Sequence, residues 1–284
     1  METTGALPSR TSQAVAAWRA LLTRPSGPHG DAGAQAALCR GMVPVADPVM
    51  RAHLRARTRF VDDQVQAALG RGTGQVVVLG AGYDDRALRF RKPGVRYFEV
   101  DHPATQDDKR LRLERAGVDV GGLTLVAADF RVDDVTTVLA RAGHRADRPS
   151  LVLAEGLLVY LDRGAVVDLL AGVRSRAAPG SALAASLAVH PEGVDSAWVT
   201  ARANAARPGA ATEPWRTVLP PLAHLALVER SGWSVVQTLG DESFDAEAVP
   251  GRSLLVLARP GGASAPDGAG RPSRAAGPAG YTGA

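Results

Sequence analysis

Short apolar runs alternate with longer amphipathic stretches through the middle of the chain. The runs are apolar at nearly every position, so they lack the alternation typical of a strand with one exposed face. Strands that helices cover on both faces have this character. Five such runs lie at residues 75–80, 95–100, 123–128, 150–156 and 181–189, with helical patterns between them at 84–90, 103–116, 133–142 and 163–177. The pattern predicts an α/β, doubly wound, mostly parallel sheet.

Two further apolar runs, 233–239 and 252–259, follow a helical pattern at 221–231. We interpret them as a final antiparallel pair, which brings the sheet to seven strands. Residues 190–216 interrupt the alternation of strands and helices, and we expect them to form a lid or a cap over the substrate.

The chain is expected to divide into three parts. An N-terminal helical region on the substrate side occupies residues 1–60, with helices at 12–22 and 34–42. The main domain covers 61–259 and is expected to begin with a helix at about 60–69 and to include a cap at about 190–232. The Gly-, Ala- and Pro-rich residues 260–284 are predicted to be a disordered tail.

Composition narrows the function classes. The chain has 284 residues, a net charge of +4 and a pI of about 9.7, but its cations are almost all arginines scattered along the sequence. Basic residues in short runs beside acids are typical of a solvated surface, so we expect no nucleic-acid binding. One cysteine allows no intrachain disulfide. With no apolar run of membrane-spanning length and no signal-peptide core, we expect a cytoplasmic protein without membrane partners or a metal site; the oligomeric state is left open.

A glycine loop follows the first strand, where doubly wound sheets bind nucleotides. It reads Gly80-Ala81-Gly82, and glycines there let a ligand approach the backbone. A dinucleotide fingerprint needs a third glycine or alanine at residue 85, but the chain has Asp84 and Asp85. Two carboxylates at a helix start oppose a pyrophosphate, so the loop disfavours NAD and favours a ligand with positive charge.

Acids also follow the next three strands. Asp101 lies 19 residues after Gly82, near the spacing of an acid that binds ribose hydroxyls. Asp129 is placed to meet an adenine amino group, with Phe130 beside the ring. Glu155 ends the fourth strand and needs a partner, because a buried unpaired carboxylate is costly. A ligand with a ribose, no phosphate and a positive charge fits these features, and S-adenosyl-L-methionine is such a ligand.

Structural alternatives remain open for each acid. Asp101 could be a turn residue before Pro103, and Asp129 could cap a helix or close a turn. Glu155 could form an ion pair with a nearby arginine.

Five segments resemble the leucine carboxyl methyltransferase family. They are ARTRFVDD (56–63), VVVLGAGYDDRALRF (76–90), YFEVDHPATQ (97–106), AADF (127–130) and LAEGLLVYL (153–161). The resemblance implies a Rossmann-like class I methyltransferase fold that uses S-adenosyl-L-methionine. It further implies that Arg57 binds the cofactor carboxylate and that Glu155 lies by the methionine part.

The chain departs from the family pattern at two places. Bacterial members usually have Asp-Thr-Arg where this chain has Asp84-Asp85-Arg86, and an Asp-Pro-Leu motif of the N-terminal part is not recognisable around Asp31. The role of Asp85 is therefore left unexplained.

The function that we expect is O-methylation of a small-molecule acceptor, at a carboxylate, in polyketide or other secondary metabolism. A carboxylate is already ionised at neutral pH and needs no base. For a phenol or alcohol, His190 could act as base and Tyr160 could hydrogen-bond the acceptor oxygen; both could instead be structural. Arg202 and Trp198 could grip an acidic aromatic acceptor. The alternatives are a noncatalytic methyltransferase-like partner subunit and an enzyme that methylates a protein C-terminal carboxylate.

Overall fold

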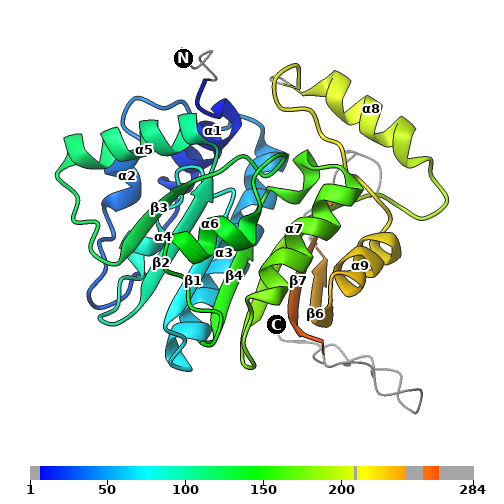
Figure 1. The fold of residues 1–284 in the computed structure, drawn as a ribbon. Coiled ribbons are helices and arrows are strands. Elements are labelled where there is room, and N and C mark those ends of the chain that lie inside the picture. Colours follow the sequence, from blue (N-terminus) through cyan, green and yellow to red (C-terminus); the bar gives the residue numbers. More distant parts are fainter. Residues whose placement is uncertain (1–6, 208–209, 241–251, 262–284) are drawn as a thin grey trace, which may run out of the picture.

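Seven strands form one sheet within residues 7–207, 210–240 and 252–261, which are the residues that the computed structural model describes (Figure 1). The strand order is β3-β2-β1-β4-β5-β7-β6. Strands β1 to β5 are parallel, and β7 runs antiparallel to both of its neighbours. The strands are β1 (Gln75–Leu79), β2 (Arg96–Asp101), β3 (Leu123–Ala127), β4 (Ser150–Ala154), β5 (Ala182–Val189), β6 (Trp233–Gly240) and β7 (Arg252–Pro260). The predicted α/β sheet with a terminal antiparallel pair is confirmed.

The strand order reverses at β1, which lies between β2 and β4. The chain moves outward in one direction through β2 and β3, then returns to the other side of β1 for β4 and β5. A crevice forms outside the carboxyl ends of the strands at such a reversal, because the following loops diverge to opposite faces. The fold therefore places the ends of β1, β2 and β4 around a common site.

Helices cover both faces of the sheet (Figure 1). The helices α6 (Val135–Arg141), α7 (Arg163–Ser175) and α9 (Pro221–Arg230) pack on one face, and α3 (Pro48–Gly70) and α4 (Arg86–Arg89) on the other. Three more helices, α1 (Arg10–Arg19), α2 (Ala34–Leu38) and α5 (Pro103–Ala116), share a smaller core. The cap contains α8 (Ser196–Ala206), and the 3-10 helix η1 (Leu158–Tyr160) follows β4.

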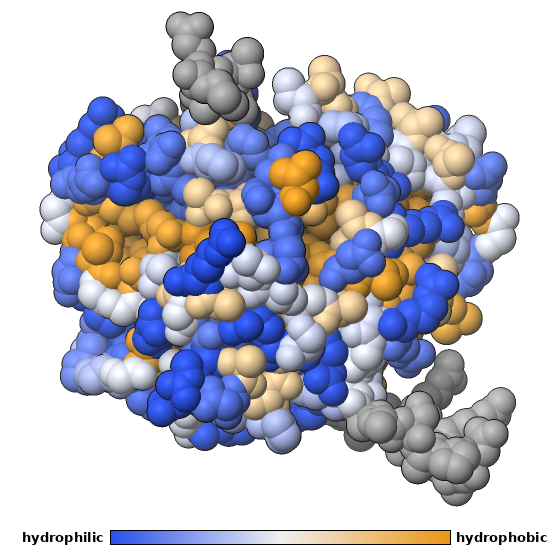
Figure 2. Space-filling view, viewed as in Figure 1, coloured by the Kyte–Doolittle hydropathy of each residue, from blue (hydrophilic) through white to orange (hydrophobic). Residues whose placement is uncertain are grey.

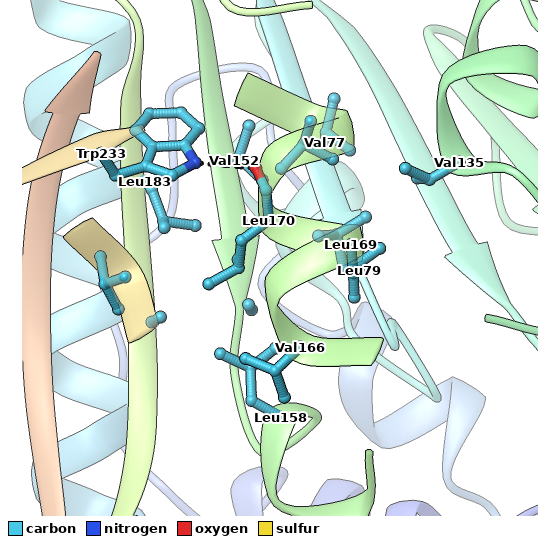
Figure 3. Packing of buried hydrophobic residues seen from close by; sticks show 14 of the residues in the cluster. Val77, Leu79, Val135, Val152, Leu158, Val166, Leu169, Leu170, Leu183 and Trp233 are labelled. Atoms are coloured by element: carbon cyan, nitrogen blue, oxygen red, sulfur yellow. Dashed lines mark hydrogen bonds between the residues drawn. The ribbon is translucent and has the colours of Figure 1, made fainter. Parts of the chain in front are cut away.

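The main core lies between α7 and the centre of the sheet (Figure 3). Leu169 and Leu170 point from α7 toward Val152 and the neighbouring strands, and all of these side chains are buried. Trp233 adds its ring to this cluster, and its Nε1 donates to the carbonyl of Leu170 at 2.9 Å. Because β4 is covered on both faces, all of its residues are buried, and all except Ser150 are apolar, as the sequence pattern indicated.

An apolar surface area marks the edge of the sheet at β3. Figure 2 shows it as an orange region on the left of the molecule. Leu123 and Leu125 of β3 are half-buried, and Val120, just before the strand, is exposed. β3 pairs with β2 alone among the described residues, so less of its surface is covered than that of the central strands.

The largest differences from the sequence prediction are at α3 and α8, and α2 also ends at Leu38, four residues before the predicted end. α3 begins at Pro48, about twelve residues earlier than expected, because Asp47 caps it by accepting from the Val49 N–H at 2.9 Å and proline fits the first helical turn. The boundary expected at residue 60 therefore falls inside α3. α8 was not predicted as a helix; Asp195 caps its start. Most of the predicted tail, from residue 262, lies outside the described residues.

No helix in the described part of the chain is both long enough and apolar enough to span a membrane.

His144 links the stability of the fold to pH. Its ring is buried, with Nε2 2.9 Å from Ser150 Oγ, and Nδ1 accepts from Arg176 Nε at 3.3 Å. Burial, aided by the charges of Arg176 and Arg96, lowers the pKa of His144 to about 4. The folded state favours the neutral ring, so the neutral form of His144 stabilises the fold relative to the unfolded chain. This stabilisation is fully present above the unfolded pKa of about 6.5 and is lost as pH falls toward 4.

We therefore expect the free energy of unfolding to fall by about 2 kcal/mol through His144 between pH 6.5 and pH 4. Urea unfolding at a series of pH values measures this. In His144→Asn the loss should be smaller, whereas in His29→Asn, at an exposed histidine, it should match the wild type. A wild-type slope in His144→Asn would contradict the assignment.

Candidate active site

The glycine loop after β1 is held in a conformation that side chains disfavour. Gly80 and Gly82 have φ angles of 61° and 50°. A Cβ on Gly80 would lie 2.9 Å from Leu157 Cδ1, and one on Gly82 would lie 2.7 Å from Ser12 Cβ. Gly82 is thus where α1 packs directly onto the loop. Ala81, between the two glycines, is buried.

Asp101, at the end of β2, is bonded to this loop. Its Oδ2 accepts from the Gly82 N–H at 2.6 Å, and its Oδ1 accepts from the His102 N–H at 2.7 Å. Burial raises the pKa of Asp101, although these two hydrogen bonds oppose the rise. The carboxylate is therefore fixed beside the glycine loop, with lone pairs left to accept further hydrogen bonds.

A buried ionic network lies next to the loop. Arg86, fully buried, is its centre: Nε donates to Asp62 Oδ1 at 2.7 Å, and Nη1 donates to Asp84 Oδ2 at 2.5 Å and to Glu155 Oε2 at 2.6 Å. The network contains the carboxylates of Asp62, Asp84, Asp85 and Glu155 and the guanidinium groups of Arg19, Arg24, Arg57, Arg86 and Arg89. These members come from α1, the segment after α1, α3, the two residues before α4, α4 itself and the end of β4.

Asp85 now has a structural explanation. Its side chain is fully buried and accepts from Arg24 Nη1 and Arg89 Nε, each at 2.7 Å. Arg24 also forms a two-pronged pair with Asp62, at 2.8 and 2.9 Å. Burial alone would raise the pKa of Asp85, but the charges of Arg24 and Arg89 outweigh it and lower the pKa. Asp85 thus ties the segment after α1 to the start of α4.

Glu155 is shared among three arginines. Its Oε1 accepts from Arg57 Nε at 2.9 Å and from Arg19 Nη2 at 3.2 Å, in addition to the Arg86 contact. Burial would raise the pKa of Glu155, but the charges of Arg86, Arg19 and Arg57 hold it well below its usual range. The ion-pair alternative considered for Glu155 is the one that the structure shows, and a role beside a cofactor stays a prediction.

The network carries one positive charge in excess. Within the described residues, its five guanidinium groups face four carboxylates. Arg57 is the most exposed of the arginines facing Glu155, and its guanidinium would lie 3.2 Å from a Cβ placed on Gly156. The buried Nε of Arg19 has no hydrogen-bond partner. An anionic group beside Arg57 and Arg19 would balance the charge.

A family model described as leucine carboxyl methyltransferase matches residues 16–174, more than half of the chain. The chain belongs to the leucine carboxyl methyltransferase family. The match includes the glycine loop, Asp101 and every member of the ionic network, so the described geometry lies within the residues that the family model matches.

Two curated relatives show how similar this family member is to named proteins. A candidate S-adenosyl-L-methionine-dependent methyltransferase of Streptomyces coelicolor is 42% identical over 175 residues, 60% of this chain and 59% of the relative. One of Frankia alni, with the same type of name, is 38% identical over 207 residues, 70% of this chain and 66% of the relative. The chain thus matches about three fifths of the length of the Streptomyces protein.

Solved structures support the fold of this family member. A methyltransferase-like structure from Thermobifida fusca has a TM-score of 0.57 at 18% identity and covers 84% of this chain and 96% of that one. Magnesium protoporphyrin IX methyltransferase from Synechocystis, solved with bound S-adenosylhomocysteine, has a TM-score of 0.50 at 14% identity, with coverages of 75% and 88%. At these identities the likeness shows the class I methyltransferase fold alone.

Asp129 and Phe130 lie where the sequence placed them, after β3. Asp129 accepts from its neighbour Arg131, at 2.6 Å from Nη2 and 2.9 Å from Nε, and the Arg131 hydrogen bonds lower the pKa of Asp129. Phe130 is half-buried against the main core. Their proposed contacts with adenine stay predictions.

His190 has both ring nitrogens occupied. Nδ1 lies 2.8 Å from the Pro191 carbonyl and Nε2 lies 2.8 Å from Ser196 Oγ. Because the carbonyl can only accept, Nδ1 carries the proton and Nε2 accepts from the serine hydroxyl. In this conformation His190 holds the start of α8 and has no nitrogen left to act as base on an acceptor.

Tyr160 ends η1 and lies half-buried beneath the cap. Trp198, in contrast, is 57% exposed, and Arg202 lies over its ring at 5.6 Å. Both side chains are exposed on α8, and none of the described contacts bears on the grip of an acidic aromatic acceptor that was expected of this pair.

Sequence reasoning gave no role to Arg19, Arg24 and Arg86. Arg86 was visible in the Asp84-Asp85-Arg86 motif, where two acids beside one arginine are a signal for pairing. Asp84 was expected to complement a positive ligand, but its side chain accepts from Arg86 and Arg19. Arg19 and Arg24 stand in N-terminal segments with no motif, and only the packing of α1 brings them to the loop. The described residues contain no group of three or more His, Cys, Asp or Glu suited to a metal ion.

Asp85→Ala should destabilise the fold strongly, by about 3–5 kcal/mol, because it leaves the buried Arg89 without a carboxylate partner and leaves Arg24 with Asp62 alone. Denaturant unfolding measures the change. Asp147→Ala is the matched control, since that carboxylate pairs with Arg145 at the surface and its loss should leave unfolding nearly unchanged. Equal effects of the two variants would show that the network does not stabilise the fold.

Proposed function

We propose that this chain binds S-adenosyl-L-methionine at the carboxyl edge of its sheet and transfers the methyl group to a carboxylate oxygen of a small acidic acceptor. The observation that carries the proposal is the placement of Asp101, bonded to the glycine loop, beside an arginine network with one positive charge in excess. Membership of the leucine carboxyl methyltransferase family and the names of the curated relatives support it.

The residues present fit the chemical groups of this cofactor. Asp101 can accept from ribose hydroxyls, since its lone pairs are not exhausted by two backbone donors. Arg57, with the unpartnered Nε of Arg19 behind it, can hold the cofactor carboxylate and neutralise the excess charge. When bound, the cofactor supplies a methyl group on a sulfonium, which is electrophilic without activation by a base.

A carboxylate acceptor agrees with the groups around the site. The acceptor oxygen is ionised at neutral pH, so the protein has to align it and exclude water rather than remove a proton. His190, which the sequence suggested as a base, has a hydrogen-bond partner at each of its two ring nitrogens. A phenol or alcohol acceptor would require a base that this arrangement does not provide through His190.

The cofactor step is tested by titration calorimetry with S-adenosyl-L-methionine and S-adenosyl-L-homocysteine. Both should bind, and NAD should not, because Asp84 Oδ1 already accepts from the Arg86 N–H at the start of α4, where a pyrophosphate would need free N–H donors. Binding of NAD in preference to both ligands would refute the proposal.

Asp101→Ala should weaken S-adenosyl-L-homocysteine binding by about 1–3 kcal/mol, because ribose hydrogen bonds to a carboxylate are lost. Asp107→Ala, at an exposed acid of α5, serves as the control and should bind as the wild type does. Circular dichroism verifies that both variants are folded. Unchanged affinity in folded Asp101→Ala would remove the ribose role.

The acceptor step is tested with cofactor labelled on the methyl group. Purified protein is incubated with a panel of carboxylic acids, each matched with its primary amide, and with phenols. Label should enter the acids as base-labile esters. Label found in phenols alone, as stable ethers, would contradict carboxylate methylation while leaving the cofactor step intact.

A further inference from the structure

A guanidinium group is held between two aromatic rings at the junction of the cap and the main domain. Arg207, directly after α8, lies with its Cζ 4.4 Å from the centre of the Trp215 ring and 5.8 Å from that of Tyr160. All three side chains are half-buried. Cations are attracted to aromatic faces, and the flat guanidinium also stacks on them.

Hydrogen bonds fix this cluster. Asn204 donates from Nδ2 to the Trp215 carbonyl at 2.9 Å and accepts from the Trp215 N–H at 2.8 Å. The reciprocal pair locks the backbone of Trp215 against α8, and the half-buried indole packs against the small core of Val159, Val199 and Val218.

The cluster also lies near the predicted methyl-transfer site. The Arg216 N–H donates to the Val159 carbonyl at 2.7 Å, which ties the segment after Trp215 to η1, and η1 begins three residues after Glu155. From the other side, Glu213 accepts from the Thr11 N–H at 3.3 Å, next to Ser12, which packs on the glycine loop. The cap loop thus joins the same α1 that borders the cofactor site.

Arg207 differs from the arginines of the ionic network because no carboxylate compensates it among the described residues. Its hydrogen bonds, to Asn204 Oδ1 and the Glu213 carbonyl, are all 3.4 Å long and end on neutral oxygens. Trp215 Nε1 is buried without a hydrogen-bond partner. A preorganised cation and an unused N–H donor therefore lie together beside two aromatic faces, and a buried unsatisfied donor is costly unless a ligand pairs with it.

We propose that Tyr160, Arg207 and Trp215 form the acceptor subsite of the proposed methyltransferase, and that it selects flat, anionic acceptors such as aromatic carboxylic acids. Arg207 binds the anionic group, and the aromatic rings contact the planar body of the acceptor. Methylation of that carboxylate removes its charge, so the ester product loses the attraction to Arg207 and is released. This inference rests on the proposed function and goes beyond it by naming the recognition residues and the acceptor class.

Arg202 and Trp198 supply a matched control. They form the same kind of cation–ring pair, at 5.6 Å, on α8, but Trp198 is largely exposed. A substitution at Arg202 therefore tests whether any arginine on an aromatic ring of the cap suffices.

The experiment is titration calorimetry of the full chain saturated with S-adenosyl-L-homocysteine, with 2-naphthoate and 2-naphthamide as probes of equal shape and different charge. Wild type should bind the acid at least tenfold more tightly than the amide. Arg207→Gln should weaken binding of the acid at least tenfold and leave the amide unchanged, whereas Arg202→Gln should alter neither. Arg207→Lys should restore only part of the affinity, because lysine keeps the charge but loses the planar fork.

The outcomes separate the two proposals. Failure to bind S-adenosyl-L-homocysteine overturns the proposed function together with this inference. If the cofactor product binds, three results overturn the inference and leave the proposed function standing. The wild type does not bind 2-naphthoate, Arg207→Gln binds the acid as tightly as the wild type does, or Arg207→Gln loses affinity for acid and amide equally. Unchanged thermal unfolding and cofactor affinity in Arg207→Gln verify that the variant is folded.

Discussion

The fully buried guanidinium of Arg86 is the interaction on which the rest of the site depends. A buried cation is tolerated when its donors meet acceptors of opposite charge, and Arg86 meets carboxylates from α3, the glycine loop and the end of β4. Its planar guanidinium group can donate hydrogen bonds to several carboxylates at once, whereas a lysine ammonium group lacks this fixed planar geometry. One side chain therefore fixes the relative positions of three elements that are distant in sequence.

The remaining members extend this constraint to the N-terminal helices. Arg19 from α1 and Arg24 from the segment after it pair with the same group of acids, so α1 is fixed over the glycine loop. Steric contact adds to the ionic constraint, because Ser12 of α1 packs where a side chain on Gly82 would stand. The wall of the proposed cofactor site and the border of the proposed acceptor subsite are consequently formed by one helix, α1. Because both sites border α1, this helix holds them at a fixed separation.

The sequence predicted most of the sheet but not every helix. Strand positions followed from the apolar runs, because burial on both faces leaves no room for polar residues, and the fold class followed from their alternation with helices. The positions of Asp101 and Glu155 at strand ends followed as well, since parallel strands place their carboxyl ends at one edge. The early start of α3 was missed because the cap at Asp47 stands before a polar, arginine-rich stretch. The helix in the cap was missed because α8 has no marked apolar face, having few buried residues.

The sequence by itself determined the sheet, the glycine loop and the acids that follow the strands, because each depends on local burial or on position within a strand–loop unit. Only the tertiary structure decided the partners of the charged groups. From the sequence, Asp84 and Asp85 were interpreted as loop acids that face a ligand. In the structure they pair with arginines that are up to 65 positions away along the chain. Likewise, nothing local distinguishes Arg207 from Arg202, and the cap has to fold against η1 before one is held between two rings and the other lies at the surface. Pairing between charges is set by distances across the fold, which the order of residues along the chain does not contain.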